Sequence, residues 1–118
     1  MLLTIGDSFE SVPAGNYVSK FLSMKPEDTS KGKAYLWKFE VLEGEETGKG
    51  ISDFSDANYA PSTKNKSGRW LAAIAKKPLK AKLQVDPDLY VGKRYMVIVE
   101  DAPSGGGKTK IVTFTQLA

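Results

Sequence analysis

The sequence predicts an all-β protein with one helix, in the order of three strands, one helix and two strands. Two observations predict this class. Alternating apolar residues and clusters of β-branched or aromatic residues recur along most of the chain, whereas only residues 66–77 place apolar residues at helical spacing. A chain of 118 residues is long enough for one domain with one modest core. We therefore expect a single domain over residues 1–118.

The first elements follow from local composition. Residues 1–14 show no sustained periodicity and include Pro13, so we expect a loosely held N-terminal arm that is not a signal peptide. β-forming residues over about 16–25 predict the first strand, and the polar stretch 26–33 predicts a turn.

The clearest strand lies at residues 35–42. One side is wholly apolar and the other is mixed, and the apolar side consists of Tyr35, Trp37, Phe39 and Val41. This pattern is typical of a half-buried antiparallel strand. It favours a core position for Trp37 and Phe39, although the pattern alone leaves open which face is buried.

The remaining elements complete the order. A glycine-rich turn leads to a short strand over 51–56. The helix over 66–77 carries Trp70, which we expect to pack against the sheet, and it ends before Pro78. Gly68 weakens its first turn, so its start is not fixed. The last two strands are expected over 93–101 and 110–117.

A long first hairpin and a single helix between the third and fourth strands is the layout of the OB-fold, a five-stranded, partly open barrel. In that fold the first and last hairpin loops flank a face that commonly binds oligonucleotides or oligosaccharides. Other small β-barrels and α+β sheets remain alternatives.

Residue types that are missing from the sequence exclude several kinds of chemistry. The chain has no cysteine and no histidine, so disulfides, a thiolate nucleophile, a Ser-His-Asp triad and an ordinary zinc site are excluded. A cytoplasmic setting fits the absence of cysteine. No apolar run approaches the ~18 residues that cross a bilayer. We expect no cofactor and no membrane contact.

The segment Gly107-Lys108-Thr109 resembles the end of a nucleotide-binding P-loop. The full motif requires a glycine where this chain has Ala102, and it requires a helix after the lysine. The following residues, 111–115, are rich in β-branched types instead. We therefore expect no nucleotide cradle here.

Acidic residues occur in close pairs, at Asp53 and Asp56, at Asp86 and Asp88, and at Glu100 and Asp101. Aspartates that cap local turns are the simpler interpretation. A metal-dependent nuclease that uses Asp53, Asp56 or Asp88 remains a rival hypothesis.

Charge is distributed unevenly along the chain, although the net charge is only +3. Residues 57–85 contain seven basic residues and no acid, whereas residues 40–56 contain six acids and one lysine. This asymmetry indicates either a basic face for a polyanion or an ordinary solvated helix.

Lysines near the expected groove and exposed aromatics predict a site for single-stranded nucleic acid, because lysines attract phosphates and aromatics stack on bases. Six aromatic residues are candidates: Tyr17, Phe21, Tyr35, Trp37, Phe54 and Tyr59. Phe54 and Tyr59 are the best of them, since polar residues flank both. The predicted site comprises Lys20, Lys31, Lys33, Lys38, Phe54, Tyr59, Lys108 and Lys110.

Several segments together resemble a known family, namely residues 15–17, 35–41, 44–51, 62–74 and 88–93. The family consists of small phage-encoded proteins that are regarded as OB-fold single-stranded-DNA-binding proteins of replication and recombination modules. The resemblance spans about residues 13–117, and it departs from the family at Lys49, where an arginine is common.

The resemblance implies non-enzymatic, largely sequence-independent binding of single-stranded DNA in the host cell cytoplasm. It also implies replication or recombination proteins as partners, and it leaves a homo-oligomer open. The alternative is a protein-interaction or virion-structural β-barrel that does not bind nucleic acid.

Overall fold

The computed structural model describes residues 12–103 and 108–117. The order of elements is the predicted one, with three strands, a helix and two strands. The elements are β1 (Gly15–Thr29), β2 (Gly32–Val41), β3 (Gly50–Asp56), α1 (Lys66–Ala75), the short 3₁₀ helix η1 (Pro87–Tyr90), β4 (Arg94–Asp101) and β5 (Thr109–Gln116).

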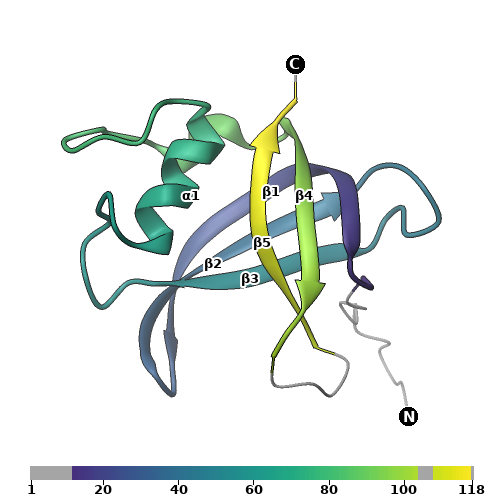
Figure 1. The fold of residues 1–118 in the computed structure, drawn as a ribbon, viewed down its shortest axis with the longest axis horizontal. Helices are drawn as coiled ribbons and strands as arrows, with labels where there is room; N and C mark the ends of the chain where they lie inside the picture. Colours follow the sequence, from purple (N-terminus) through teal and green to yellow (C-terminus); the bar gives the residue numbers. More distant parts are fainter. Residues whose placement is uncertain (1–11, 104–107, 118) are drawn as a thin grey trace, which may run out of the picture.

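The five strands form one antiparallel sheet in the order β3-β2-β1-β4-β5. The sheet is strongly curled, so that β4 and β5 cross over β1, β2 and β3 (Figure 1). The two edge strands approach each other, and the Ile111 N–H of β5 donates a hydrogen bond to the Asp53 carboxylate of β3 at 2.8 Å. The predicted fold class is confirmed by this element order and by the curled five-stranded sheet.

The core lies between the two halves of the curled sheet. On β2 the apolar side of the alternating pattern faces inward, since Trp37, Phe39 and Val41 are fully buried. Phe114 of β5 meets this row, with ring centroids 5.7 Å from Trp37 and 5.1 Å from Phe39. Tilted and edge-on ring pairs of this kind add about 0.5–1.5 kcal/mol each beyond the area they bury.

Helix α1 closes one end of the core. Trp70 is buried against Trp37, with ring centroids 5.6 Å apart, as the sequence predicted. The helix begins after Asn65, whose side chain accepts the Gly68 N–H. It ends at Ala75, two residues before the predicted end, because the following residue, Lys76, adopts a left-handed backbone conformation (φ 53°). Within the described residues, no helix is long and apolar enough to cross a membrane.

The first hairpin differs from the prediction. The sequence predicted a turn over 26–33, but β1 continues to Thr29 and β2 begins at Gly32, so the turn itself is short. Pro26 is tolerated in β1 because the pairing with β4 ends at Lys20, and from there on β2 is the main partner of the strand. Lys33 therefore lies on a strand and not in a loop.

The N-terminal prediction needs one correction. Residues 1–11 of the predicted arm lie outside the described residues. Val12, which the prediction placed in the arm, is only 2% exposed and belongs to the core cluster. An apolar side chain that reaches the core anchors the chain just before β1.

Candidate nucleic-acid interface

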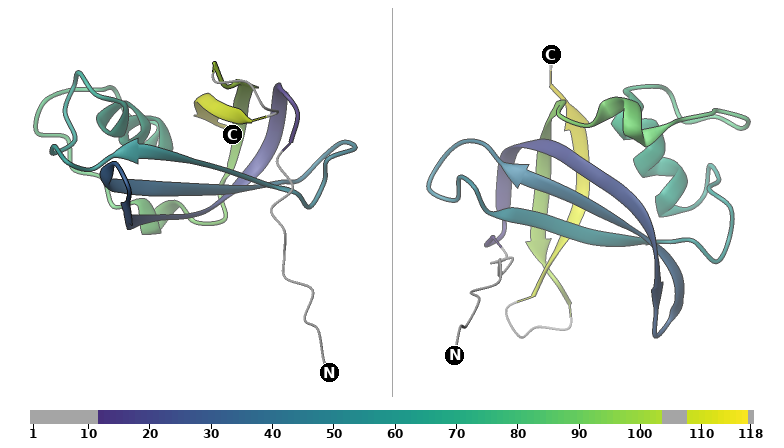
Figure 2. Two further views of the ribbon diagram at one scale, coloured as in Figure 1. Left: turned by 90° about the horizontal axis from the view of Figure 1, so that it is seen from below. Right: turned by 180° about the vertical axis from the view of Figure 1, so that it is seen from behind.

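The outer face of β1, β2 and β3 carries the candidate interface. Strand registers set the neighbours on this face: Lys25 lies opposite Leu36, which lies opposite Phe54. The next row joins Ser23, Lys38 and Ser52. The right-hand view of Figure 2 shows these three strands in front of β4 and β5. Polar and basic residues thus surround the apolar pair Leu36 and Phe54 on an open surface.

Phe54 is the aromatic residue of this face. Strand alternation turns Ile51 and Ser55 of β3 inward and Phe54 outward, where it remains 45% exposed. It lines a hollow of about 480 Å³ between the tip of the first hairpin and β3, whose lining residues are Thr29, Ser30, Lys31, Lys33, Ala34, Phe54, Ser55 and Asp56. We refer to it as the Phe54 hollow. The structure therefore brings three of the predicted site residues together.

Charges at the Phe54 hollow favour an anion. Lys31 and Lys33 are exposed, and neither forms an ion pair with an acidic side chain among the described residues. Asp56 is the acid that lines this hollow. A second hollow of about 380 Å³ near the same hairpin has the opposite balance, since Glu27 and Asp28 line it together with Lys33. A phosphate is therefore expected in the first hollow.

The other end of the outer face is nearly neutral. Lys20 forms an ion pair with Glu40 at 3.4 Å, across the β1–β2 pairing. Arg94, which lies opposite Lys20 on β4, pairs with Glu43 at 3.0 Å. These carboxylates offset the nearby cations. Lys20 and Lys38 thus share the face with Phe54. Lys31 and Lys33, which form no ion pair among the described residues, lie at the hairpin end, where Asp28 stands opposite Lys33.

Tyr59 lies beside the same hairpin. It is 77% exposed and follows Asn58, whose Oδ1 accepts the Lys33 N–H at 3.0 Å. The prediction of an exposed aromatic is confirmed for both Phe54 and Tyr59.

Lys108 and Lys110 belong to the other hairpin. Lys110 lies opposite Glu100 on β4 and directly precedes Ile111, which is bonded to Asp53 of β3. In Figure 1 the described ends of this hairpin project past β3 on the same side as the tip of the β1–β2 hairpin. Lys110 therefore lies on β5 next to the residue that contacts β3, whereas Lys108 is exposed and lies just before β5 begins.

Of the six aromatic candidates, Phe21 was predicted wrongly as a stacking platform, whereas the burial of Trp37 is the core position that its strand pattern favoured. Phe21 and Trp37 are fully buried, because strand alternation turns both into the core. Tyr35 packs partly against the core. The hydroxyl of Tyr17 donates to the Pro13 carbonyl, which holds this ring near the start of β1.

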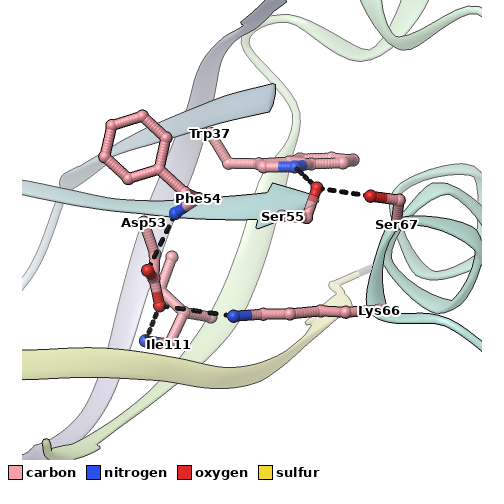
Figure 3. Close-up of polar contacts among 7 residues, drawn as sticks. All are labelled: Trp37, Asp53, Phe54, Ser55, Lys66, Ser67 and Ile111. Carbon is pink, nitrogen blue, oxygen red and sulfur yellow. Dashed lines mark hydrogen bonds and ion pairs between the residues drawn. The ribbon is translucent and has the colours of Figure 1, made fainter. Parts of the chain in front are cut away.

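Asp53 is a residue that the sequence reasoning placed in the wrong role. Its carboxylate accepts the N–H groups of Phe54 and Ile111, each at 2.8 Å, and lies 3.8 Å from the Lys66 ammonium (Figure 3). It therefore fixes the strand that carries Phe54 to the strand that carries Lys110. A signal was present, because Asp53 shares the inward parity of Ile51 and Ser55, where a charge is unexpected.

A buried hydrogen-bond chain joins β2, β3 and α1 near the Phe54 hollow. The Trp37 indole N–H donates to Ser55 Oγ at 2.9 Å, and Ser67 Oγ lies 2.8 Å from Ser55 Oγ (Figure 3). Ser67 Oγ also lies 2.6 Å from the Asp56 carbonyl oxygen. Because buried polar groups need partners, this chain fixes the positions of Ser55 and Asp56, which both line the Phe54 hollow.

Asp56 and Asp86 accept hydrogen bonds in local turns. Asp86 accepts the Asp88 N–H at 3.1 Å, and Asp56 accepts the Asn58 N–H at 3.2 Å. Across residues 12–103 and 108–117, no three acidic, histidine or cysteine side chains gather as metal ligands would. After Lys108 the chain enters β5 and not a helix, which agrees with the rejection of a P-loop.

Comparison of this chain with protein-family models, with curated proteins and with solved structures finds no match. The resemblance to the phage family therefore stays a prediction. The candidate interface depends on the geometry and charge described above.

Proposed function

We propose that this protein binds single-stranded DNA without catalysis and with little dependence on base sequence. The observation that supports the proposal best is the Phe54 hollow, where a half-exposed aromatic ring lies beside two lysines that have no acidic partner among the described residues. A base would stack on Phe54, and the adjacent phosphates would lie near Lys31 and Lys33.

The geometry suits a flexible polymer. The face is an open surface, so bases of different size fit on it, and the ring of Phe54 offers a stacking contact that every base can use. A duplex keeps its bases paired and stacked, so it gains nothing from Phe54. Binding of this kind agrees with a place in DNA replication or recombination in a host cytoplasm, which the resemblance implies.

A titration of a labelled 6-nucleotide oligo-dT strand, and of a duplex of equal charge, tests the proposal at 0.05 M and 0.2 M monovalent salt. Each single-strand phosphate contact contributes a slope of about −0.7 in log affinity against log salt, so contacts to Lys31 and Lys33 alone predict a roughly sevenfold loss between these concentrations. Equal binding of the duplex, or affinity that does not change with salt, contradicts the proposal.

Variants of Phe54 separate stacking from simple apolar contact. Phe54→Leu keeps an apolar side chain on the strand but removes the aromatic face, and it should raise Kd about 5- to 150-fold for a loss of ~1–3 kcal/mol per stacked base. Phe54→Trp should retain the affinity of the wild type. Val112→Ala, at an exposed apolar position on β5, is the matched control and should change little.

Charge variants test the lysines. The pair Lys31→Gln and Lys33→Gln should lower the salt slope by about 1.4. The pair Lys76→Asn and Lys77→Gln removes equal charge at the C-terminal end of α1 and should leave the slope unchanged for a 6-nucleotide strand. Lys20→Gln should have a smaller effect than Lys33→Gln, because Glu40 already pairs with Lys20. Self-assembly without any DNA binding would favour the protein-interaction β-barrel instead.

A further inference from the structure

The loop of residues 58–65 is bound at both ends although its surface is exposed. At one end the Asn58 side chain accepts the N–H of Lys33, on the first hairpin. At the other end the Asn65 side chain accepts the N–H groups of Ser62 and Gly68, at 3.0 Å and 2.9 Å, and donates to the Ala60 carbonyl. The loop therefore forms a fixed bridge from the Phe54 hollow to the start of α1.

A close contact between Gly68 of α1 and the backbone of Ser62 also fixes this loop. A Cβ on Gly68 would lie 1.8 Å from the Ser62 carbonyl oxygen, so only glycine allows α1 to approach the loop this closely. Tyr59 is mounted on this fixed loop and is the most exposed of the large apolar and aromatic side chains in residues 12–103 and 108–117. A rigid platform binds a flexible ligand better than a mobile one, since less conformational entropy is lost.

Positive charge gathers where the loop meets α1. Lys64 and Arg69 are exposed, and the Arg69 guanidinium donates to the Lys64 carbonyl at 3.4 Å, which holds the two residues on one side of the helix start. Neither forms an ion pair within the described residues, and the first turn of α1 has no acid. Lys66 differs, because it pairs with Asp53 and lies over the Trp70 ring.

This arrangement is unfavourable for α1 alone. The N-terminal end of a helix carries a partial positive charge, and acids, not bases, normally stabilise it. Lys64 and Arg69 add two more positive charges at that end, and neither has an acidic partner among the described residues. A bound phosphate group would relieve the repulsion from both cations and from the helix dipole.

We propose that a single strand longer than the Phe54 hollow continues over this bridge, with a further base stacked on Tyr59 and phosphates held by Lys64 and Arg69. The inference rests on the proposed function and extends its site from the outer face of the sheet to the start of α1. It assigns the basic residues at the start of α1 to the same polymer and not to a second ligand.

Two oligonucleotide lengths test this path. The 6-nucleotide strand covers the Phe54 hollow, and a 20-nucleotide strand is long enough to reach α1. For each length, the Kd of the variant is divided by the Kd of the wild type, which removes the effect of the number of binding registers. Lys64→Gln with Arg69→Gln should raise Kd about 25-fold for the long strand at 0.1 M salt, from two contacts with a slope of about −0.7 each.

Lys64→Gln with Arg69→Gln should leave the Kd of the 6-nucleotide strand unchanged. Tyr59→Ala should weaken only the long strand, and Tyr59→Phe should restore it because the ring is kept. The control pair Lys76→Asn and Lys77→Gln lies at the far end of α1, about 15 Å along a ten-residue helix. Asparagine tolerates the left-handed backbone of position 76, so this pair should alter neither length.

The results separate the two levels of the proposal. If the wild type binds the short strand but Lys64→Gln with Arg69→Gln has the same effect on both lengths, or no effect on either, the extended path is wrong and the Phe54 site stands. If the wild type binds neither length, the proposed function itself is wrong. Thermal unfolding of each variant shows whether a loss of affinity comes with a loss of the fold.

Discussion

Substitution of Asp53 by asparagine tests how the two edges of the curled sheet are held together. Asparagine has nearly the same shape, so the change leaves no cavity, but it removes the charge and replaces one carboxylate oxygen with an amide donor. The Asp53 carboxylate accepts two backbone N–H groups at 2.8 Å, from Phe54 and from the buried Ile111. The amide oxygen of an asparagine can accept only one of these two N–H groups. Its NH₂ group would then point at the other backbone N–H, so that two donors would face each other.

The expected loss follows from these contacts. Hydrogen bonds to a charged group contribute about 1.5–3 kcal/mol, and one of the two is lost while the other is weakened. The ion pair with Lys66 at 3.8 Å is partly exposed and adds little. We expect a decrease of about 3 kcal/mol in the free energy of unfolding, which lowers Tm by roughly 10 °C for a domain of this size.

Urea unfolding followed by tryptophan fluorescence measures this change, because Trp37 and Trp70 are both buried. Asp101→Asn is the matched control, since Asp101 is an exposed residue of β4, and it should change the free energy by less than about 0.5 kcal/mol. If Asp53→Asn is as stable as Asp101→Asn, the Asp53 carboxylate does not hold β3 to β5.

Three further substitutions, at Gly68, Ser55 and Tyr95, test the free energy of unfolding. Gly68→Ala should destabilise by about 3 kcal/mol in urea unfolding, because the new Cβ meets the Ser62 carbonyl, whereas helix propensity alone predicts a gain of about 1 kcal/mol. Ser55→Ala should cost about 1–3 kcal/mol by leaving the Trp37 indole N–H without its partner, and an unchanged urea midpoint would contradict this. Burial raises the pKa of Tyr95 to about 12, with a smaller contribution from Tyr90. The unfolded chain loses this phenolic proton near pH 10, while the folded protein keeps it up to about pH 12. The contribution of Tyr95 to the free energy of unfolding is therefore fully present below pH 10. It is lost between pH 10 and pH 12, which lowers stability by on the order of 2 kcal/mol. Tyr95→Phe should be less dependent on pH between 8 and 11, and an equal dependence in both proteins would refute the assignment.

The sequence by itself determined the class of fold. Strict alternation in 35–41 favoured a core position for Trp37 and Phe39, and helical spacing around Trp70 located α1, because these periodicities depend on local backbone geometry and on burial of one face. The same reasoning identified Phe54 and Tyr59 as exposed aromatics, since polar neighbours in the sequence mark solvent-facing positions.

Tertiary structure decided which of the candidate residues lie together. β1 can continue past Pro26 because its pairing with β4 ends at Lys20. The local sequence does not predict where that pairing ends. The role of Asp53 depended on β5, 58 positions along the chain, and the pairing of Lys20 with Glu40 depended on strand register. Contacts of this kind arise when distant segments pack, and so the positive charge that remains at the Phe54 hollow could be identified only in the folded chain.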